Sequence, residues 1–368
     1  MQLVKTHRDT LLRPLQIVSG IVERRHTLPI LANILIRKEG ERVSFLSTDI
    51  EVQITTHAQV GSGEDVAATT VAARKLLDIL RALPDSSDVS LSLANKRMTV
   101  QSGKSRFALQ TLAAEDFPTV AQAEHYNATV TLPQKKLKHL FNMVHFSMAQ
   151  QDIRYYLNGL LLVVDGRNVI AVATDGHRLA FCQIETEQEF PRQEVIIPRK
   201  TILELQRLLD DTDDPVQLDI ANNQVKLSFA NIELISKLVE GKFPDYTRVI
   251  PKGYKNGFTI GRDQLLHSLQ RAAIMTSDKF KGVRCIVAPG SLKISSTNAE
   301  QEEAVEEIEI DYGGDSVDIG FNVSYLLDIV NNLKDDYVNI ALGDANSSAL
   351  VTIPGNDDFK YVVMPMRI

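Results

Sequence analysis

The sequence has few of the features that mark secreted proteins, membrane proteins and most enzymes. Cys182 and Cys285 are its only cysteines, and both stand in apolar surroundings. We therefore expect buried, reduced thiols of the cytoplasmic kind, and neither a disulfide nor a metal site. No apolar run approaches the length that spans a bilayer, and the stretch MQLVKTHRDT has no apolar signal core. We expect a cytoplasmic protein with no membrane partner.

Motifs of catalysis are also missing. The eight histidines form no HExxH motif, and the chain contains neither a GxSxG elbow nor a GxxxxGK[ST] phosphate loop. The acidic run DDTDD at 210–214 stands between a predicted helix and a predicted strand. We interpret it as a solvated turn rather than a metal site. The sequence predicts no catalytic residue, no metal and no cofactor.

The bulk composition is that of a soluble globular protein. The chain has 368 residues, of which 44% are hydrophobic and 24% charged. This length exceeds one ordinary core and fits two or three domains. The formal net charge of −7 argues against a generally basic nucleic-acid binder. It leaves open how the charge is distributed.

The chain repeats itself three times. Similar stretches are STDIEVQI from Ser47, ATDGHRLAFCQI from Ala173 and STNAEQEEAVEEI from Ser296, which recur about every 125 residues. A second marker, VAARKLLDILRAL, returns as IPRKTILELQRLL and FNVSYLLDIVNNL at the same interval. A Phe-Pro or Met-Pro pair closes each repeat. We predict three similar domains, which span residues 1–120, 128–245 and 252–368.

Each repeat is itself roughly doubled. Strands rich in Thr and Val precede stretches with apolar residues at helical spacing, and alternating apolar runs follow. We expect two helices and about eight strands per repeat, in an α+β fold with the helices gathered on one side of antiparallel sheets. The predicted helices span residues 8–25, 73–81, 134–145, 199–207, 262–271 and 324–334.

Positive charge is concentrated in the predicted helices. Together they carry a net charge of +10, so the rest of the chain carries −17. Exposed helix faces are often basic, and one such helix would mean little. A bias shared across a threefold repeat predicts a positive face on an acidic body. Such a face holds duplex phosphates without reading sequence and lets a protein slide.

Long stretches resemble one family, the bacterial DNA sliding clamps, which are the beta subunits of DNA polymerase III holoenzyme. The resemblance is carried by RRHTLPILANILI, FSMAQQDIRYYLNGLL, ATDGHRLA, SKLVEGKFPDYTRV, GFNVSYLLDIV and YVVMPMRI. It implies three DNA-clamp domains per chain and a head-to-tail homodimeric ring, with helices lining the hole. The implied function is that of a processivity factor without enzymatic activity, which encircles double-stranded DNA.

The resemblance also implies partner proteins. A clamp loader opens such a ring, and the replicative polymerase, other polymerases and repair proteins bind it through short peptides. These peptides enter a hydrophobic groove. The implied groove residues are Leu157, Thr174, Gly176, His177, Arg178, Leu179, Pro244, Arg248, Val249, Asn322, Tyr325, Ser348, Val362, Met364, Pro365, Met366 and Arg367.

Contacts to DNA are implied in the same way. The residues are Arg25, Arg74, Gln151, Tyr155, Tyr156, Lys200 and Arg248. For Tyr155 and Tyr156 core packing is an equal alternative, since one of two neighbours in a strand points inward. Arg154 fits either the DNA loop or the groove.

Opposite charges at the two ends of the chain predict how copies join. Residues 96–106 contain four basic residues and no acid, whereas residues 300–309 contain six Glu and no base. Apolar residues are expected at the centre of this interface. The predicted dimer residues are Arg97, Lys104, Arg106, Phe107, Leu109, Ile274, Met275, Glu300, Glu302 and Glu303.

Two other functions stay open at this point. The chain could be an enzyme that uses His177 and Asp175, although the first and third repeats have different residues in their place. It could also be a structural repeat protein without DNA contact. Loss of turnover or loss of peptide binding on His177→Ala separates the first alternative from a clamp.

Overall fold

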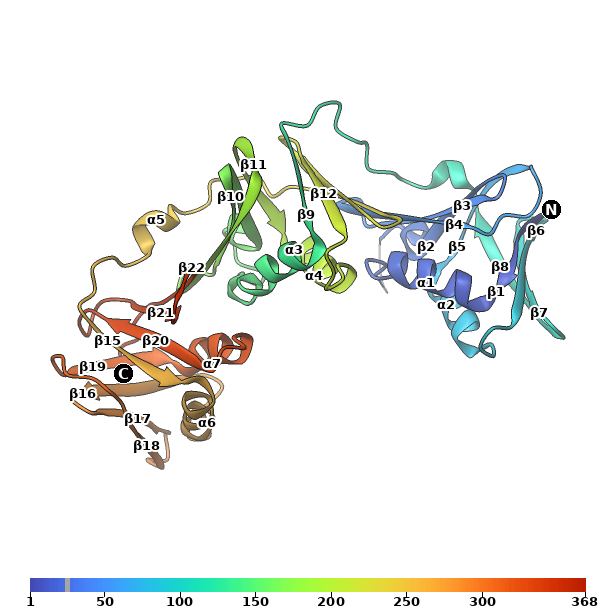
Figure 1. The fold of residues 1–368 in the computed structure, drawn as a ribbon. Helices are drawn as coiled ribbons and strands as arrows, with labels where there is room; N and C mark the ends of the chain where they lie inside the picture. Colours follow the sequence, from blue (N-terminus) through green and yellow to red (C-terminus); the bar gives the residue numbers. More distant parts are fainter. Residues whose placement is uncertain (24–26) are drawn as a thin grey trace. The chain divides into compact units, whose positions relative to one another are not determined.

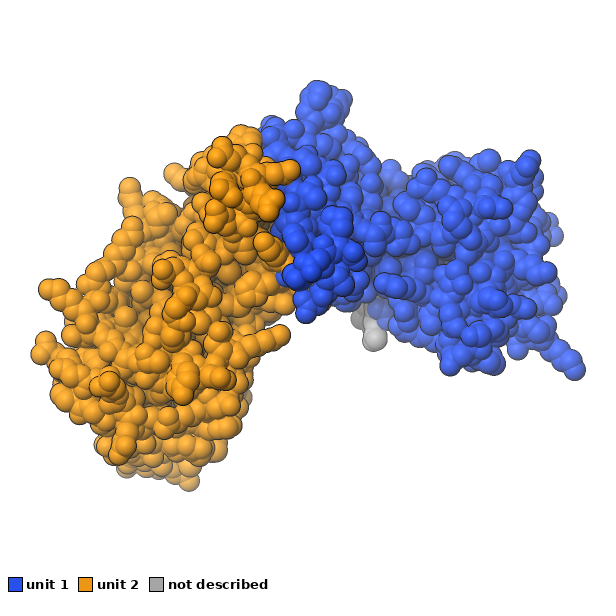
Figure 2. All heavy atoms as spheres, viewed as in Figure 1, with its two compact units in different colours: residues 1–135, 203–238 blue, residues 136–202, 239–368 orange. Residues whose placement is uncertain are grey.

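The computed structural model describes residues 1–23 and 27–368 (Figure 1). Arg25, a predicted DNA contact, lies outside the described residues. The chain divides into two compact units, which Figure 2 colours separately. Unit 1 contains residues 1–135 and 203–238, and unit 2 contains residues 136–202 and 239–368. In the described part of the chain, no helix has the length and apolar character needed to cross a membrane.

Unit 1 is built on a sheet of twelve strands in which neighbouring strands pair antiparallel. Alternate buried and exposed positions along these strands follow the alternation in the sequence. In spatial order the strands are β1 (Gln2–His7), β6 (Asp88–Ala94), β7 (Arg97–Ser102), β8 (Ser105–Leu112), β5 (Val66–Ala72), β2 (Asn33–Glu39), β3 (Arg42–Thr48), β4 (Val52–Gln59), β14 (Ile232–Lys237), β13 (Gln224–Phe229), β12 (Pro215–Ile220) and β9 (Ala128–Pro133).

The helices of the first repeat are α1 (Arg8–Ser19) and α2 (Ala73–Ala82), which pack against each other on one side of the strands (Figure 1). Leu11, Leu15 and Val18 of α1 are fully buried, at the spacing of one helical face. The second repeat contributes α3 (Gln134–Asn142) and α4 (Arg199–Leu208). Short 3-10 turns are η1 (Pro29–Ala32) and η2 (Ala114–Asp116).

Unit 2 contains two antiparallel sheets. The sheet of six strands has the order β10 (Gly159–Thr174), β11 (Arg178–Pro198), β22 (Asn356–Val363), β21 (Ala349–Ile353), β20 (Tyr337–Leu342) and β15 (Asn256–Gly261). The sheet of four strands has the order β18 (Glu303–Glu309), β17 (Ser291–Thr297), β16 (Gly282–Ala288) and β19 (Val317–Asn322). The remaining elements are α5 (Tyr246–Val249), α6 (Arg262–Ala273), α7 (Val323–Asn332), η3 (His145–Ser147) and η4 (Tyr155–Leu157).

The predicted fold class is confirmed, and the predicted helix ends need correction. All six predicted helices exist, but α1 ends at Ser19, α3 at Asn142 and α7 at Asn332. At α1, the Arg207 guanidinium binds carbonyls of the last turn and occupies the space beside Gly20. The first and third repeats have eight strands each. The second has six, because β10 and β11 form one long hairpin whose register shifts near Gly166.

Neighbouring repeats join strand to strand. In unit 1, β4 of the first repeat pairs antiparallel with β14 of the second, with Leu234 opposite Ile54. In unit 2, β11 of the second repeat pairs antiparallel with β22 of the third, with Leu179 opposite Val362. Each junction therefore uses an inner strand of one repeat and the last strand of the next. These main-chain hydrogen bonds make the sheets continuous across the repeats.

Candidate functional site

The candidate site of unit 2 is centred on the turn at residues 174–179, which joins β10 to β11. The Asp175 carboxylate accepts hydrogen bonds from the backbone N–H groups of His177 at 2.9 Å and Arg178 at 3.1 Å. The Thr174 hydroxyl accepts from the Gly176 N–H at 3.1 Å. Gly176 has φ +92°, a left-handed conformation that favours glycine. Side chains thus satisfy the turn's own backbone, and its tip faces outward.

The first repeat has the same turn with different chemistry at its tip. Asp49 accepts from the N–H groups of Glu51 and Val52, and the Ile50 N–H donates to the Thr48 hydroxyl. Ile50 takes the place of Gly176 and has φ +80°. The Thr-Asp pair is therefore a folding device that two repeats share. Only the second repeat carries Gly-His-Arg at the tip, so the specific role of this turn lies in those side chains.

Arg178 ties the turn to α7 of the third repeat. Its guanidinium is one-tenth exposed, and it pairs with Asp175 at 3.2 Å and with Asp328 at a short distance. The guanidinium carbon also lies 4.6 Å from the centre of the Tyr325 ring, on which His177 stacks at 6.4 Å. A charge this buried is stable only when paired on several sides. Arg178 therefore holds the second and third repeats together beneath the turn.

Arg154 lies on the other side of the turn. Its guanidinium donates two hydrogen bonds to the Asp152 carboxylate, at 3.0 and 2.9 Å, and a long one of 3.4 Å to the Asp175 carbonyl. The hydrogen bonds from Arg154 lower the pKa of Asp152 to about 2. A side chain at position 176 would meet the guanidinium of Arg154 at 3.0 Å. Glycine suits this position by its conformation, and a larger residue would also require the Arg154 side chain to shift slightly.

The chain's last strand and tail form the opposite wall. After β22, the Met364 N–H donates to the His177 carbonyl at 2.9 Å, and the Met366 N–H donates to the Gly320 carbonyl at 2.7 Å. Pro365 between them has no N–H and donates no hydrogen bond. Met364 is 49% exposed, while Val362 beneath it is buried. An apolar, flexible side chain is thus held at the surface by main-chain bonds on both sides.

Together these parts enclose a pocket of about 210 Å³. Its floor continues into a buried apolar cluster that includes Leu179, Val362 and Phe243. The volume is below that of a typical pocket for a whole drug-sized ligand and suits one or two side chains of a larger ligand. The lining residues are Arg154, Tyr156, Leu157, Thr174, Gly176, His177, Arg178, Leu179, Pro244, Val249, Val362 and Met364.

Ten of the seventeen residues predicted for the groove line this pocket, and seven do not. Asn322 caps α7 by accepting from the Ser324 N–H at 2.9 Å, and Tyr325 lies behind His177. The Ser348 carbonyl accepts from the Tyr254 hydroxyl at 2.6 Å. Four others do not line the pocket: Arg248 on α5, and Pro365, Met366 and Arg367 of the tail. Arg154, for which the groove was one of two alternatives, lines the pocket, and so does Tyr156, which was predicted as a DNA contact.

The two adjacent tyrosines differ in their surroundings. Neither lies in a strand, because both belong to the 3-10 turn η4. Tyr155 is 71% exposed, whereas Tyr156 packs on the apolar cluster beneath the pocket. The expectation of alternating strand positions was therefore wrong, although one of the two does point inward. The packed ring of Tyr156 is part of the pocket wall.

Other residues predicted to contact DNA are on the surface. Arg74 of α2 and Gln151 are exposed, and the Arg248 side chain is 87% exposed and pairs with Asp245 at 3.1 Å. Lys200 of α4 is half-buried. Gln151 has φ +54°, so the loop before η4 is held in an uncommon conformation for a residue other than glycine. Such strain is found where a loop is shaped for contact.

The charged strands predicted for dimer formation are sheet edges. Residues 105–110 of β8 pair with β7 alone, since β5 meets only Thr111 and Leu112. β18 is the last strand of its sheet. The basic residues Arg97, Lys104 and Arg106 and the acidic residues Glu300, Glu302 and Glu303 are all exposed. Ile274 is 72% exposed and Met275 and Phe107 are half-buried, whereas Leu109 is buried within the chain.

The chemistry at the turn does not form a catalytic arrangement. The structure gives the His177 ring a stacking contact with Tyr325 but, among the described residues, no hydrogen bond to a nucleophile or to a carboxylate. A catalytic imidazole needs both a group to serve and a group that orients it. The DDTDD run forms an exposed loop between α4 and β12, where Asp213 pairs with Lys135 at 2.8 Å.

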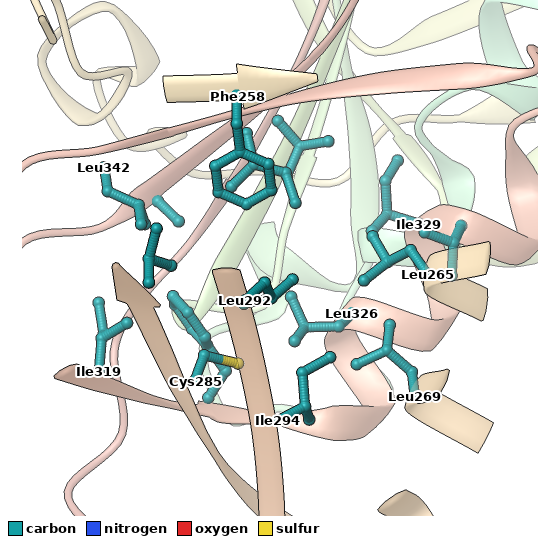
Figure 3. A pocket seen from close by; sticks show the side chains of 16 residues that line it. Phe258, Leu265, Leu269, Cys285, Leu292, Ile294, Ile319, Leu326, Ile329 and Leu342 are labelled. Atoms are coloured by element: carbon teal, nitrogen blue, oxygen red, sulfur yellow. The ribbon is translucent and has the colours of Figure 1, made fainter. Parts of the chain in front are cut away.

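A second, closed cavity lies in the core of the third repeat. It measures about 40 Å³, and its lining is apolar, with Phe258, Leu292 and the thiol of Cys285 among the side chains that point into it (Figure 3). A space of this size and polarity stays dry. The cavity is a packing defect between α6, α7 and the sheets.

Both cysteines are expected to resist alkylation in the native protein. They are free and buried, as the sequence predicts, and burial raises the pKa of each thiol to about 12. The thiolate is the reactive form and is almost absent at pH 8. Mass spectrometry after iodoacetamide treatment at pH 8 should show no adduct on native protein and two adducts in denaturant. Rapid modification of either thiol in the folded chain would contradict this.

The fold and the site define the class of protein, a chain of three repeated DNA-clamp domains, each with two helices and antiparallel sheet. Models of three domains of one family match it, namely the DNA polymerase III beta subunit N-terminal domain at residues 1–121, its central domain at 131–245 and its C-terminal domain at 247–367. The chain belongs to this family, the beta sliding clamps, which are DNA polymerase processivity factors and not enzymes.

Individual relatives are similar over almost the whole length. The beta sliding clamp of Pseudomonas putida is 46% identical over 363 residues, and that of Escherichia coli K12 is 44% identical over 361, with 98% of each chain covered. A crystal structure of the Pseudomonas aeruginosa clamp with a ligand has a TM-score of 0.97 at 43% identity, with 100% of both chains covered. A structure of that organism's clamp bound to griselimycin has a TM-score of 0.96 at 43% identity.

Proposed function

We propose that two copies of this chain close head to tail into a ring around duplex DNA, and that the pocket of unit 2 tethers partner proteins to it. The partners are the catalytic subunit of the replicative polymerase, a clamp loader, and other polymerases and repair proteins that carry short clamp-binding peptides. The pocket at the 174–179 turn carries the proposal. It is apolar at its floor, polar at its rim and flanked by an exposed methionine.

An extended peptide with a Gln and a Leu-Phe pair fits this pocket. Its apolar side chains would bury against Leu179 and Val362, while Arg154 and His177 offer polar groups at the rim. Met364 can adjust to different partners, since its side chain is unbranched and half exposed. Two related clamps have been crystallised with griselimycin bound, so clamps of this family can hold a ligand. The remaining groove residues of the sequence prediction extend the site along the tail.

Ring closure follows from the way the repeats already join within the chain. β4 pairs with β14, and β11 pairs with β22, so an inner strand meets the last strand of the next repeat. In the third repeat the corresponding inner strand is β18, which is an edge of its sheet. In the first repeat the last strand is β8, and its residues 105–110 are an open edge as well. β18 carries glutamates, whereas Lys104 precedes β8 and Arg106 lies in it. Pairing β18 of one copy with β8 of the other continues the pattern and neutralises both edges.

The basic helix positions supply the contact with DNA. Arg74, Lys200 and Arg248 would bind phosphates together with Arg25, and Gln151 and Tyr155 would touch the duplex from their exposed loop. Contacts of this kind are independent of sequence and weaken with salt, so the ring stays free to move. We assign the three clamp domains to residues 1–120, 128–245 and 252–368, and the protein to the cytoplasm. The mechanism requires no cofactor or metal.

The topological part of the proposal is tested by retention on DNA. Protein loaded onto a nicked circular plasmid by a clamp loader should co-elute with the DNA in gel filtration, because a closed ring cannot leave a circle. Cutting the plasmid once with a restriction enzyme should then release at least about nine-tenths of it, since retention rests on linkage more than on affinity. A control plasmid without the cleavage site keeps the ring. Equal retention on cut and uncut DNA would exclude encirclement.

A further inference from the structure

The junctions between repeats share a polar contact besides the paired strands. At both junctions, the second helix of one repeat donates a hydrogen bond to the end of the first helix of the preceding repeat. Arg207 Nη2 of α4 donates to the Ile17 carbonyl of α1 at 2.9 Å. Asn332 Nδ2 of α7 donates to the Asn142 carbonyl of α3 at 2.8 Å. The last carbonyls of a helix carry its negative dipole end, so a donor there is stabilising. We call this the helix-end contact.

The repeats can be matched residue by residue at this contact. The Ser47 hydroxyl donates to the Val18 carbonyl of α1, and the Ser296 hydroxyl donates to the Ala272 carbonyl of α6. Val18 therefore corresponds to Ala272. Two positions earlier, Gln16 corresponds to Asn142 in the second repeat and to Gln270 in the third.

The donor helices match directly in the first two repeats, whereas in the third the same alignment puts Asn331 at the position of Arg207, and the donor Asn332 follows one residue later. Aligning IPRKTILELQRLL with VAARKLLDILRAL places Arg207 of α4 at the position of Arg81 in α2. The same alignment places Glu204 at the position of Asp78. Glu204 pairs with Arg207 at 2.7 Å, and the Asp78 carboxylate lies 4.0 Å from Arg81. The first repeat therefore carries a second copy of the acid–arginine pair.

The donor and the acceptor of a third helix-end contact are both present in the chain, Arg81 in the first repeat and the end of α6 in the third. The Arg81 side chain is 55% exposed, and within the described residues the one ion pair given for it is the long one to Asp78. At the end of α6, Ile274 is 72% exposed. Within the described part of the chain, no other helix donates a hydrogen bond to this end of α6. A second copy of the chain is the partner that completes the contact.

We infer that Arg81 of one copy donates to the carbonyl of Gln270 in the last turn of α6 of the second copy. This rests on the proposed head-to-tail dimer, which brings β8 of one copy to β18 of the other. α6 packs beside β18, and α2 packs on β2 and β5 of the sheet that contains β8. It adds a directional polar contact to the charged strand edges. Because each copy supplies one donor and one acceptor end, the contact forms twice in a ring of two chains.

The two donors reach neighbouring carbonyls in the last turn of the helix. A side chain at Gly20 would lie 2.1 Å from Arg207 Nη2, so this guanidinium fills the space above the glycine and reaches Ile17. The second repeat has Phe146 at that position, and its donor reaches Asn142, one residue earlier. The third repeat has Ile274 there. At both junctions the carbonyl at one aligned position accepts from the second helix, Gln16 from Arg207 Nη1 at 3.5 Å and Asn142 from Asn332 at 2.8 Å, so its counterpart Gln270 is the expected acceptor.

Three variants test the inference, and each replaces an arginine by a side chain of similar size. Arg81→Met removes every donor, Arg81→Gln removes the charge but keeps an amide donor like that of Asn332, and Arg13→Met is the control on an exposed arginine of α1. Sedimentation over a concentration series gives the dimer dissociation constant. We expect Arg81→Met to raise it about tenfold, or about threefold at each of the two interfaces. Arg81→Gln should recover part of the loss, and Arg13→Met should match the native protein.

The outcomes separate this inference from the proposed ring. A native chain that stays monomeric at all concentrations overturns the ring and the contact with it. A native dimer whose dissociation constant is the same in Arg81→Met overturns the contact alone. If Arg81→Gln and Arg81→Met weaken the dimer equally, Arg81 acts through its charge alone. That result also overturns the hydrogen bond. Arg81 is exposed, so the monomer's unfolding temperature should be unchanged and serves as the folding check.

Discussion

Removal of residues 364–368 is expected to weaken binding of a partner peptide at least about thirtyfold, or ~2 kcal/mol, because the pocket loses an apolar wall. Met364 lines the pocket directly, and Met366 anchors the tail to Gly320 by a hydrogen bond of 2.7 Å. The truncated chain still contains the whole of β22, which ends at Val363 and pairs with β11. The loss should therefore fall on binding rather than on folding.

The measurement is fluorescence polarisation with a labelled extended peptide that carries a Gln and a Leu-Phe pair. Deletion of Ile368 alone is the matched control, since this side chain is 60% exposed and does not line the pocket. The control should bind as the native chain does, and both truncations should keep the native far-ultraviolet circular dichroism. Undiminished affinity in the chain that ends at Val363 would show that the tail is no part of the peptide site.

Arg178→Met is expected to destabilise unit 2 by about 2–3 kcal/mol, because it leaves two carboxylates without the cation between them. Asp175 is 16% exposed, so its charge is poorly solvated once Arg178 is gone. Asp328 is 43% exposed and recovers part of its hydration, which keeps the expected loss at the lower end. The stacking of the guanidinium on Tyr325 is lost as well. Peptide binding should fall with it, since Arg178 also lines the pocket.

Calorimetry on the full chain measures the effect as a fall in the unfolding temperature of at least about 5 °C. The midpoint is the appropriate quantity, since two units need not unfold in one transition. Arg192→Met is the matched control: Arg192 also pairs with two carboxylates, Asp165 and Glu194, but its side chain is 53% exposed. Exposed pairs contribute little, so this variant should shift the midpoint by about 1–2 °C at most. Equal shifts in the two variants would refute the role given to Arg178.

The sequence predicted the type and order of the helices because periodicity is local. Leu11, Leu15 and Val18 are spaced for one helical face, and that face is buried. Helix ends were predicted less well, since partners distant in the chain decide them. The end of α1 depends on Arg207, which lies 190 residues away from Ile17. Tyr155 and Tyr156 were ambiguous for the same reason, as only packing distinguishes an exposed ring from a half-buried one.

The peptide groove shows the same division between features that the sequence predicts and features that only the folded chain decides. Its turn could be recognised in the sequence, because Thr174, Asp175 and Gly176 satisfy their own neighbours' backbone groups. Arg154 and Tyr156 could not be assigned to it, because their contacts with Gly176 and Gly241 are made only in the folded chain. Arg178 was expected at the groove, but its ion pair with Asp328 spans 150 residues and has no sequence signature.

By itself the sequence determined the threefold repeat, the α+β class, the absence of catalytic motifs and the concentration of positive charge in the helices. These follow from composition and spacing along the chain, which need no knowledge of what touches what. The tertiary structure alone decided that β18 and residues 105–110 of β8 are open sheet edges and that Arg178 is buried between two repeats. It also decided that, among the described residues, Arg81 and the end of α6 have no partner of the kind that Arg207 and the end of α1 have. Those are statements about which surfaces are already covered, and burial is a property of the folded chain rather than of any segment in it.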